Sequence, residues 1–187
     1  MRDLKHLIAF ENLLQEANNE LVRQGKADGK RALGYTCYFM PEVLLDLPGC
    51  FAVRLRAPKC TSPDMATYYM SSRTCHYGRS LFERALEGGY NFLDALIGQE
   101  CCCTMNRMEQ YFEYCGLIPK EKFFVACIDM PINRSEWHVG YYRRQMEKKI
   151  LEPLRETYGV DFSEERLRAA IAEHNELCRI ITEMGAL

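Results

Sequence analysis

The sequence predicts an α/β protein with a four-stranded, parallel, Rossmann-like sheet covered by helices, an N-terminal helix before the sheet and two long C-terminal helices after it. Short apolar runs with strand character alternate with helical segments between residues 31 and 134, a pattern typical of parallel strands in one sheet. The chain has 187 residues, of which 48% are hydrophobic. That is enough to bury a core between the sheet and its helices.

Three segments follow from the periodicity. Apolar residues recur at helical spacing over residues 4–22, until "QGKADGK" interrupts the pattern, so residues 1–30 are expected to form a helix and its connection. Residues 31–134 would form the parallel core. Residues 135–187 would form the two long helices, broken near "YGVDFSEE", where Asp161 and Ser163 are candidate N-caps. These helices would lead to a second domain that is absent here.

Within the core, strands are expected at residues 31–39, 49–55, 92–98 and 122–130. Helices are expected between them: residues 41–47, which begin with Pro41, residues 76–90, which stop at Gly88 and Gly89, and residues 103–115. In open parallel sheets, ligands gather outside the carboxyl ends of the strands. We therefore expect the functional residues at that edge.

Charge and composition exclude several classes of protein. A formal net charge of −2 indicates neither a nucleic-acid partner nor an anionic membrane surface. No apolar run approaches the roughly 20 residues that span a bilayer, and "MRDLKHLIAFENLL" carries acids where a signal peptide is apolar. We expect a cytoplasmic protein, in which thiols stay free unless they bind metal or do redox chemistry. Five of the ten cysteines are predicted to be structural: Cys50, Cys60, Cys115, Cys127 and Cys178, the last two on apolar stretches of a strand and a helix.

The remaining cysteines fall near the expected carboxyl edge. Cys37 ends the first strand, and Cys101, Cys102 and Cys103 follow the third. Cys75 precedes the helix at residues 76–90, so Cys75 and Cys102 would both lie near helix N-termini. The partial positive charge there lowers a thiol pKa and favours an anionic cluster. Three arginines close by in sequence could hold further negative charge: Arg73, Arg79 and Arg107.

The spacing of these thiols favours one kind of metal centre over another. Structural zinc sites usually have two close pairs of cysteines such as C-x-x-C. Cys75 and Cys102 are far apart in sequence, and neither belongs to such a pair. Thiolates brought from separate loops suit an iron–sulfur cluster better. His76 adjoins Cys75, but a lone neighbouring histidine is more typical of a supporting or solvent-exposed group than of a ligand. Spacing alone leaves the presence of a cluster open.

Three stretches resemble, in order and spacing, the N-terminal half of the 2-hydroxyacyl-CoA dehydratase D-component family, which includes benzoyl-CoA reductase subunits and double-cubane cluster proteins. They are "GYTCYFMPEVLL", "CHYGRSLFERALEGGYNFLDALIGQECCCTMNRM" and the segment from "FFVACIDMP" to "AIAEHNE". The most specific parts are Cys-x-x-x-Arg-Ser at Cys75 to Ser80, "ALEGGYNFLDAL" and "LRAAIAEHN". The resemblance implies an iron–sulfur cluster, [4Fe-4S] or double cubane, that three cysteines of each subunit hold.

The resemblance also ranks the candidate residues. Cys75 matches the first ligand, and Cys102 matches the second because the family's "CDTMRRL" aligns on residues 102–108. The third ligand of the family lies in the second domain, which leaves Cys37, Cys101 and Cys103 as secondary candidates here. Cys103 stands where the family commonly has aspartate. Glu42, after Pro41, would position substrate or move a proton; alternatively, it is an acid that favours the helix dipole.

The activity that the resemblance implies belongs to anaerobic metabolism. Such a lyase removes water from a 2-hydroxyacyl-CoA through a ketyl radical, with an electron from an ATP-hydrolysing activator protein; relatives of the benzoyl-CoA reductase kind carry out reductions. Family subunits are longer than this chain, so either a companion subunit would supply the missing domain or the chain is a fragment. The alternative is a non-catalytic or degenerate α/β interaction module of the same fold without a cluster.

Overall fold

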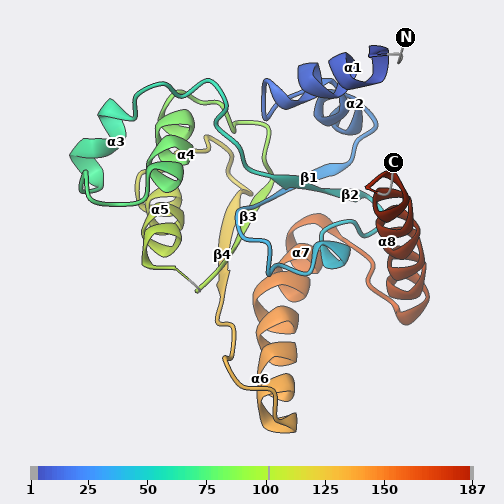
Figure 1. Ribbon diagram of the computed structural model, residues 1–187. Helices are drawn as coiled ribbons and strands as arrows, with labels where there is room; N and C mark the ends of the chain where they lie inside the picture. Colours follow the sequence, from blue (N-terminus) through green and yellow to red (C-terminus); the bar gives the residue numbers. More distant parts are fainter. Residues whose placement is uncertain (1–3, 101, 186–187) are drawn as a thin grey trace.

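The structure, a computed structural model, describes residues 4–100 and 102–185. Its centre is a four-stranded sheet in which all strands run parallel, in the order β2-β1-β3-β4 (Figure 1). The strands are β1 (Arg31–Tyr35), β2 (Cys50–Arg54), β3 (Ala95–Gln99) and β4 (Phe124–Ile128). The predicted fold class is confirmed. Each strand is shorter than expected because the apolar residues that flank it pack in loops outside the ladder.

Both faces of the sheet are buried. On one face, Ala32 and Leu96 pack against α2 (Glu20–Ala27), α4 (His76–Leu86) and α5 (Cys103–Tyr114). On the other, Leu33 and Ile97 pack against α7 (Glu152–Tyr158) and α8 (Glu164–Met184). Figure 1 shows α4 and α5 on one side of the sheet and α7 and α8 on the other. Because neighbouring residues of a strand point to opposite faces, these near-continuous apolar strands bury both.

The expected single helix over residues 4–22 is two helices, α1 (Lys5–Leu14) and α2. Asn19 separates them, because its side chain accepts a hydrogen bond from the Val22 N–H at 3.1 Å and so caps a new helix. Its amide also donates to the carbonyl of Leu13 at 3.0 Å. Helix α1 buries no residue, whereas Val22 of α2 lies in the core.

Two elements of the core differ from expectation. The segment predicted as a helix over residues 41–47 forms only the 3-10 turn η1 (Glu42–Leu44). A short helix that the prediction lacked, α3 (Asp64–Tyr69), precedes α4. The buried carboxylate of Glu83 on α4 accepts the Ala66 N–H at 2.6 Å, so α3 is held by a residue distant in sequence. Local propensity does not reveal a cap of that kind.

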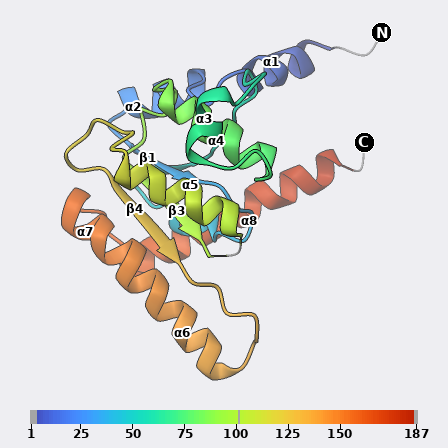
Figure 2. The ribbon, with the colours of Figure 1, turned by 90° about the vertical axis from the view of Figure 1, so that its left-hand side faces the viewer.

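The two long C-terminal helices are confirmed. The first runs without interruption through α6 (Glu136–Met146), the π-helical turn η2 (Glu147–Leu151) and α7, and Gly159 ends it at φ 68°. Ser163 is the N-cap of α8 as predicted, but its side chain makes no capping bond; Asp161 instead accepts the Ser163 N–H at 2.9 Å. Figure 2 shows α6 projecting beyond β4, away from the sheet. In the described ranges, no helix is both long and apolar enough to cross a membrane.

Candidate functional site

Cys75 lies at the N-terminus of α4, where it is the N-cap residue and its side chain makes no capping bond. The thiol is exposed. The first backbone N–H groups of a helix have no partner inside the helix, so they present positive charge to a group at this position. His76, the neighbour considered as a ligand, lies with Nδ1 3.1 Å from the Ser80 hydroxyl, which fits a structural role.

Cys102 takes the same position on α5. It is the N-cap of that helix in extended conformation, and its thiol is exposed. Hydrogen bonds from the backbone N–H groups of Met105 and Thr104 hold the pKa of the Cys102 thiol below its ordinary value. Partial burial opposes this shift. Cys103 is the first residue of α5 and is exposed, whereas Cys101 lies outside the described residues. The N-terminus of α5 therefore favours a thiolate at Cys102.

The first turns of α4 and α5 pack against each other. A Cβ at Gly78 would lie 2.5 Å from Cγ2 of Thr104 and 2.8 Å from Cε of Met105, so only glycine permits this approach. A hollow of about 490 Å³ lies beside the contact, lined by Thr74, Cys103 and other residues. The structure thus brings the N-termini that carry Cys75 and Cys102 to the same end of two neighbouring helices, as the sequence predicted for the carboxyl edge.

Cys37 lies two residues beyond β1 and is half-buried. Tyr77 lies on the first turn of α4, two residues after Cys75. Burial raises the pKa of the Tyr77 phenol, Arg54 lowers it, and the thiols of Cys37 and Cys75 raise it. Because both thiols act on one phenol, Cys37 belongs to the same edge as Cys75.

Glu42 opens η1 and is half-buried. Burial raises the pKa of its carboxyl, and the neighbouring Asp46 raises it further, while His174 of α8 lowers it. The turn η1 packs on α8, so these neighbours belong to the face of the sheet opposite α4 and α5. The catalytic role of Glu42 stays a prediction.

The arginines expected near the thiols make different contacts. Arg79 donates from Nε to the carbonyl of Thr74 at 3.2 Å and so holds the loop that precedes Cys75. Arg107 lies over the Tyr111 ring, with the guanidinium carbon 5.8 Å from its centre. Among the described residues, neither they nor Arg73 pair with a carboxylate. No described carboxylate therefore offsets the charge of these three arginines by direct pairing.

Glu109 is a buried carboxyl beneath this edge that the sequence analysis missed. It is 1% exposed and accepts a hydrogen bond from the Thr36 hydroxyl at 3.0 Å, while its Oε2 has no partner. Burial raises its pKa to about 7, although hydrogen bonds from Thr36 and Cys127 oppose the shift and Glu100 adds to it. A Cβ at Gly98 would lie 1.9 Å from Oε2, so the carboxyl rests directly on β3. The signal was present in the sequence, because Glu109 interrupts the apolar stripe Met105, Met108 and Phe112.

Comparison with known proteins decides the family. The family described as "2-hydroxyglutaryl-CoA dehydratase, D-component" matches residues 37–187, which include both helices with an N-terminal cysteine. The chain belongs to this family. The matched range of this D-component chain begins at Cys37, so α1, α2 and β1 lie outside it.

Two relatives resemble this D-component chain at low identity. The (R)-phenyllactyl-CoA dehydratase beta subunit of Clostridium sporogenes is 21% identical over 178 residues, which are 95% of this chain and 46% of that protein. The (R)-2-hydroxyglutaryl-CoA dehydratase subunit beta of Acidaminococcus fermentans is 24% identical over 170 residues, 87% of this chain and 44% of that protein. The chain thus spans somewhat less than half the length of the relatives it matches.

The donors present in this D-component chain fit an iron–sulfur cluster in kind. Thiolates are the usual protein ligands of such clusters, and two helix N-termini favour the negative charge of the assembly. They fall short in number: within residues 4–100 and 102–185, no three His, Cys, Asp or Glu side chains lie close enough to hold a metal ion. A complete ligand set needs a further donor or a rearrangement of these loops.

Some cysteines predicted as structural in this D-component chain lie outside the core. Cys50 is buried, and Cys60 and Cys127 are half-buried, but Cys115 and Cys178 are exposed. Helix α8 packs on the core through Leu167 and Ala170 near its start. The apolar residues that follow are exposed to solvent, Ile171 by 47% and Ile181 by 57%. The prediction for Cys178 was wrong because helical periodicity does not show where a helix leaves the core.

Proposed function

We propose that the chain is the iron–sulfur component of a 2-hydroxyacyl-CoA dehydratase-like lyase, or of a related reductase, and acts with a companion subunit. The observation that carries the proposal is the pair of cysteines, Cys75 and Cys102, at the N-termini of two helices whose first turns are packed together. The family match spans both cysteines. The printed names of the relatives, beta subunits of two acyl-CoA dehydratases, support an acyl-CoA substrate and a partner chain.

In this proposal the residues of the chain bind and orient. The N–H groups at the start of α5 stabilise the Cys102 thiolate, and Cys75 takes the same N-cap position on α4. A bound cluster, [4Fe-4S] or double cubane, would supply electron transfer and a Lewis-acid site for a substrate oxygen. A third thiolate would come from Cys37 or Cys103, or from Cys101, or from the companion. An ATP-hydrolysing activator protein would deliver the electron.

This chain offers the companion subunit an exposed surface at the carboxyl end of the sheet. An apolar hollow of about 570 Å³ lies between the loop after β4 and α6, with Phe39, Ile132 and Val139 among its lining residues. Ile132 is 98% exposed and Val139 is 62% exposed. Apolar side chains gathered and exposed in this way mark interaction sites, so we place the companion's domain here.

The proposal is tested on protein made without oxygen, together with a companion subunit and the activator. We expect iron and acid-labile sulfide in the preparation, a brown absorption that air bleaches, and elimination of water from a 2-hydroxyacyl-CoA. Stoichiometric zinc without iron would contradict the cluster. A stable complex without iron or turnover would support the interaction module instead, the reading favoured by the incomplete set of ligands among the described residues.

A further inference from the structure

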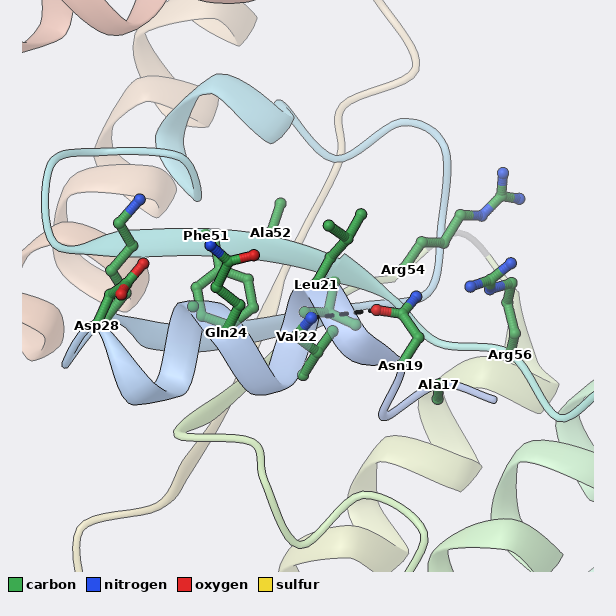
Figure 3. A pocket seen from close by; sticks show the side chains of 13 residues that line it. Ala17, Asn19, Leu21, Val22, Gln24, Asp28, Phe51, Ala52, Arg54 and Arg56 are labelled. Carbon is green, nitrogen blue, oxygen red and sulfur yellow. Dashed lines mark hydrogen bonds between the residues drawn. The ribbon is translucent and has the colours of Figure 1, made fainter. Parts of the chain in front are cut away.

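A groove runs along the free edge of the sheet, away from the cysteines of α5. It has a volume of about 620 Å³ and lies between α2 and the edge strand β2 (Figure 3). That volume is in the range of small-molecule sites. The family match begins at Cys37, so it includes the β2 side of the groove and leaves α2 outside.

The groove carries a surplus of positive charge. Arg54 and Arg56 line one end and Lys30 lines it as well, against one acid, Asp28. Figure 3 shows the two arginines together at the end of β2 where α2 begins, with Asp28 at the opposite end of the helix. In the part of the chain that the structure describes, neither arginine pairs with a carboxylate.

The arginines keep hydrogen-bond donors for an anion. Arg54 is exposed, its guanidinium carbon lies 5.9 Å from the centre of the Tyr38 ring, and it donates one hydrogen bond to the Tyr77 phenol. Arg56 donates from one nitrogen to the carbonyl of Leu13 at 3.4 Å. A guanidinium has five N–H donors in a planar fork that matches phosphate, so most donors of both residues remain available.

Apolar side chains also line the groove, beside the polar residues Asn19 and Gln24. Phe51 lines it from β2, and Leu21, which is 60% exposed, lines it from α2. A Cβ at Gly25 would lie 2.9 Å from the Phe51 ring, so glycine lets the ring lie close against the helix. Cations beside an apolar surface suit a ligand that joins phosphates to a planar base.

The cationic end of the groove adjoins the cysteine edge. Arg54 is the last residue of β2, and its guanidinium carbon lies 5.9 Å from the ring of Tyr38, the residue that follows Cys37 in the loop after β1. A ligand whose phosphates lay on the two arginines could therefore extend an arm toward those thiols.

We propose that this groove binds the phosphorylated nucleotide end of an acyl-CoA, with its phosphates on Arg54 and Arg56 and its base against Phe51 and Leu21. The proposal rests on the proposed function for the identity of the ligand. The arm between diphosphate and thioester would lead from the groove toward Cys37 and Cys75.

Isothermal titration of the full chain with CoA, adenosine 3′,5′-bisphosphate and inorganic diphosphate tests the site without any assay of turnover. We expect both nucleotides to bind more tightly than diphosphate, and binding to weaken as salt is raised. Arg54→Gln and Arg56→Gln should each weaken nucleotide binding about tenfold, the effect of one lost charge-assisted contact. Equal binding of diphosphate and nucleotide would overturn the contact with the base.

Two further variants show whether a loss of binding is specific to the groove or reflects a loss of the fold. Leu21→Asp alters an exposed side chain and should weaken binding by repelling the phosphates, whereas Arg168→Gln, the same change of charge on α8, should leave binding unchanged. Equal losses in both, or arginine variants that bind like the wild type, would overturn the site. Cys75→Ser should keep nucleotide binding while it lowers iron content. Failure of the cluster and failure of this groove are therefore separate results.

Discussion

At the scale of single residues, Glu109 shows how a buried group makes stability depend on pH. Its pKa of about 7 in the folded protein lies above the ordinary value of 4.5. Between these two values the folded state holds a proton that the unfolded state has lost. Stability therefore falls as pH rises through this window, by roughly 3 kcal/mol in total, and levels off above it. The described neighbours of this carboxyl include Thr36, Gly98 and Cys127, and none of these three carries a positive charge.

Glu109→Gln should remove this dependence. The amide oxygen still accepts from the Thr36 hydroxyl, and no charge is buried at high pH. We expect the variant to be more stable than the wild type at pH 8, by up to about 3 kcal/mol, and close to it near pH 5. Urea unfolding across that range measures the difference. Glu113→Gln, at an exposed position of the same helix, is the control, and a difference that stayed constant with pH would contradict this explanation.

At the scale of secondary-structure elements, the contact between α4 and α5 determines where the two N-terminal cysteines lie. It depends on Gly78, whose missing side chain leaves room for Thr104 and Met105. The helix itself would favour alanine over glycine by up to about 1 kcal/mol. The close approach of the two first turns outweighs that preference.

Gly78→Ala should therefore destabilise the protein, by about 1–3 kcal/mol, because the added carbon would lie 2.5 Å from Cγ2 of Thr104 and force the helices apart. Gly140→Ala is the matched control. In α6 the nearest atom to an added Cβ is Nη1 of Arg144 at 3.5 Å, so this substitution should leave stability unchanged or raise it slightly. Thermal unfolding of both variants decides the matter, and equal effects would contradict the packing argument.

At the scale of the whole molecule, the alternation of strands and helices predicted the sheet and its long C-terminal helices correctly. The same reasoning placed Cys75 and Cys102 at helix N-termini, because each cysteine directly precedes a helical pattern. It missed the Glu83 cap of α3, which depends on a contact between residues distant in sequence. It also missed Glu109, although that acid interrupts an apolar stripe of its helix. It also placed Cys178 in the core, although an apolar stripe identifies a face of a helix and not what covers that face.

The exposed hollow beside α6 yields a prediction at the same scale. Ile132→Asp should abolish association with the companion subunit, because it puts a charge at the centre of an apolar contact. The side chain is 98% exposed, so the unfolding free energy of the chain alone should change by less than about 0.5 kcal/mol. Light scattering of the mixed proteins measures association. Leu7→Asp, on the exposed face of α1, is the comparison, and an equal loss there would place the interface elsewhere.

The central claim is that Cys75 and Cys102 hold an iron–sulfur cluster at the N-termini of α4 and α5. Iron and sulfide content per chain, measured on oxygen-free protein with its companion, tests it most directly when single serine variants are compared. The account predicts strong depletion in Cys75→Ser and Cys102→Ser. It predicts wild-type content in Cys115→Ser, which alters an exposed thiol at the opposite end of α5. Equal iron in all three variants, or an equal loss from all three, would contradict the claim.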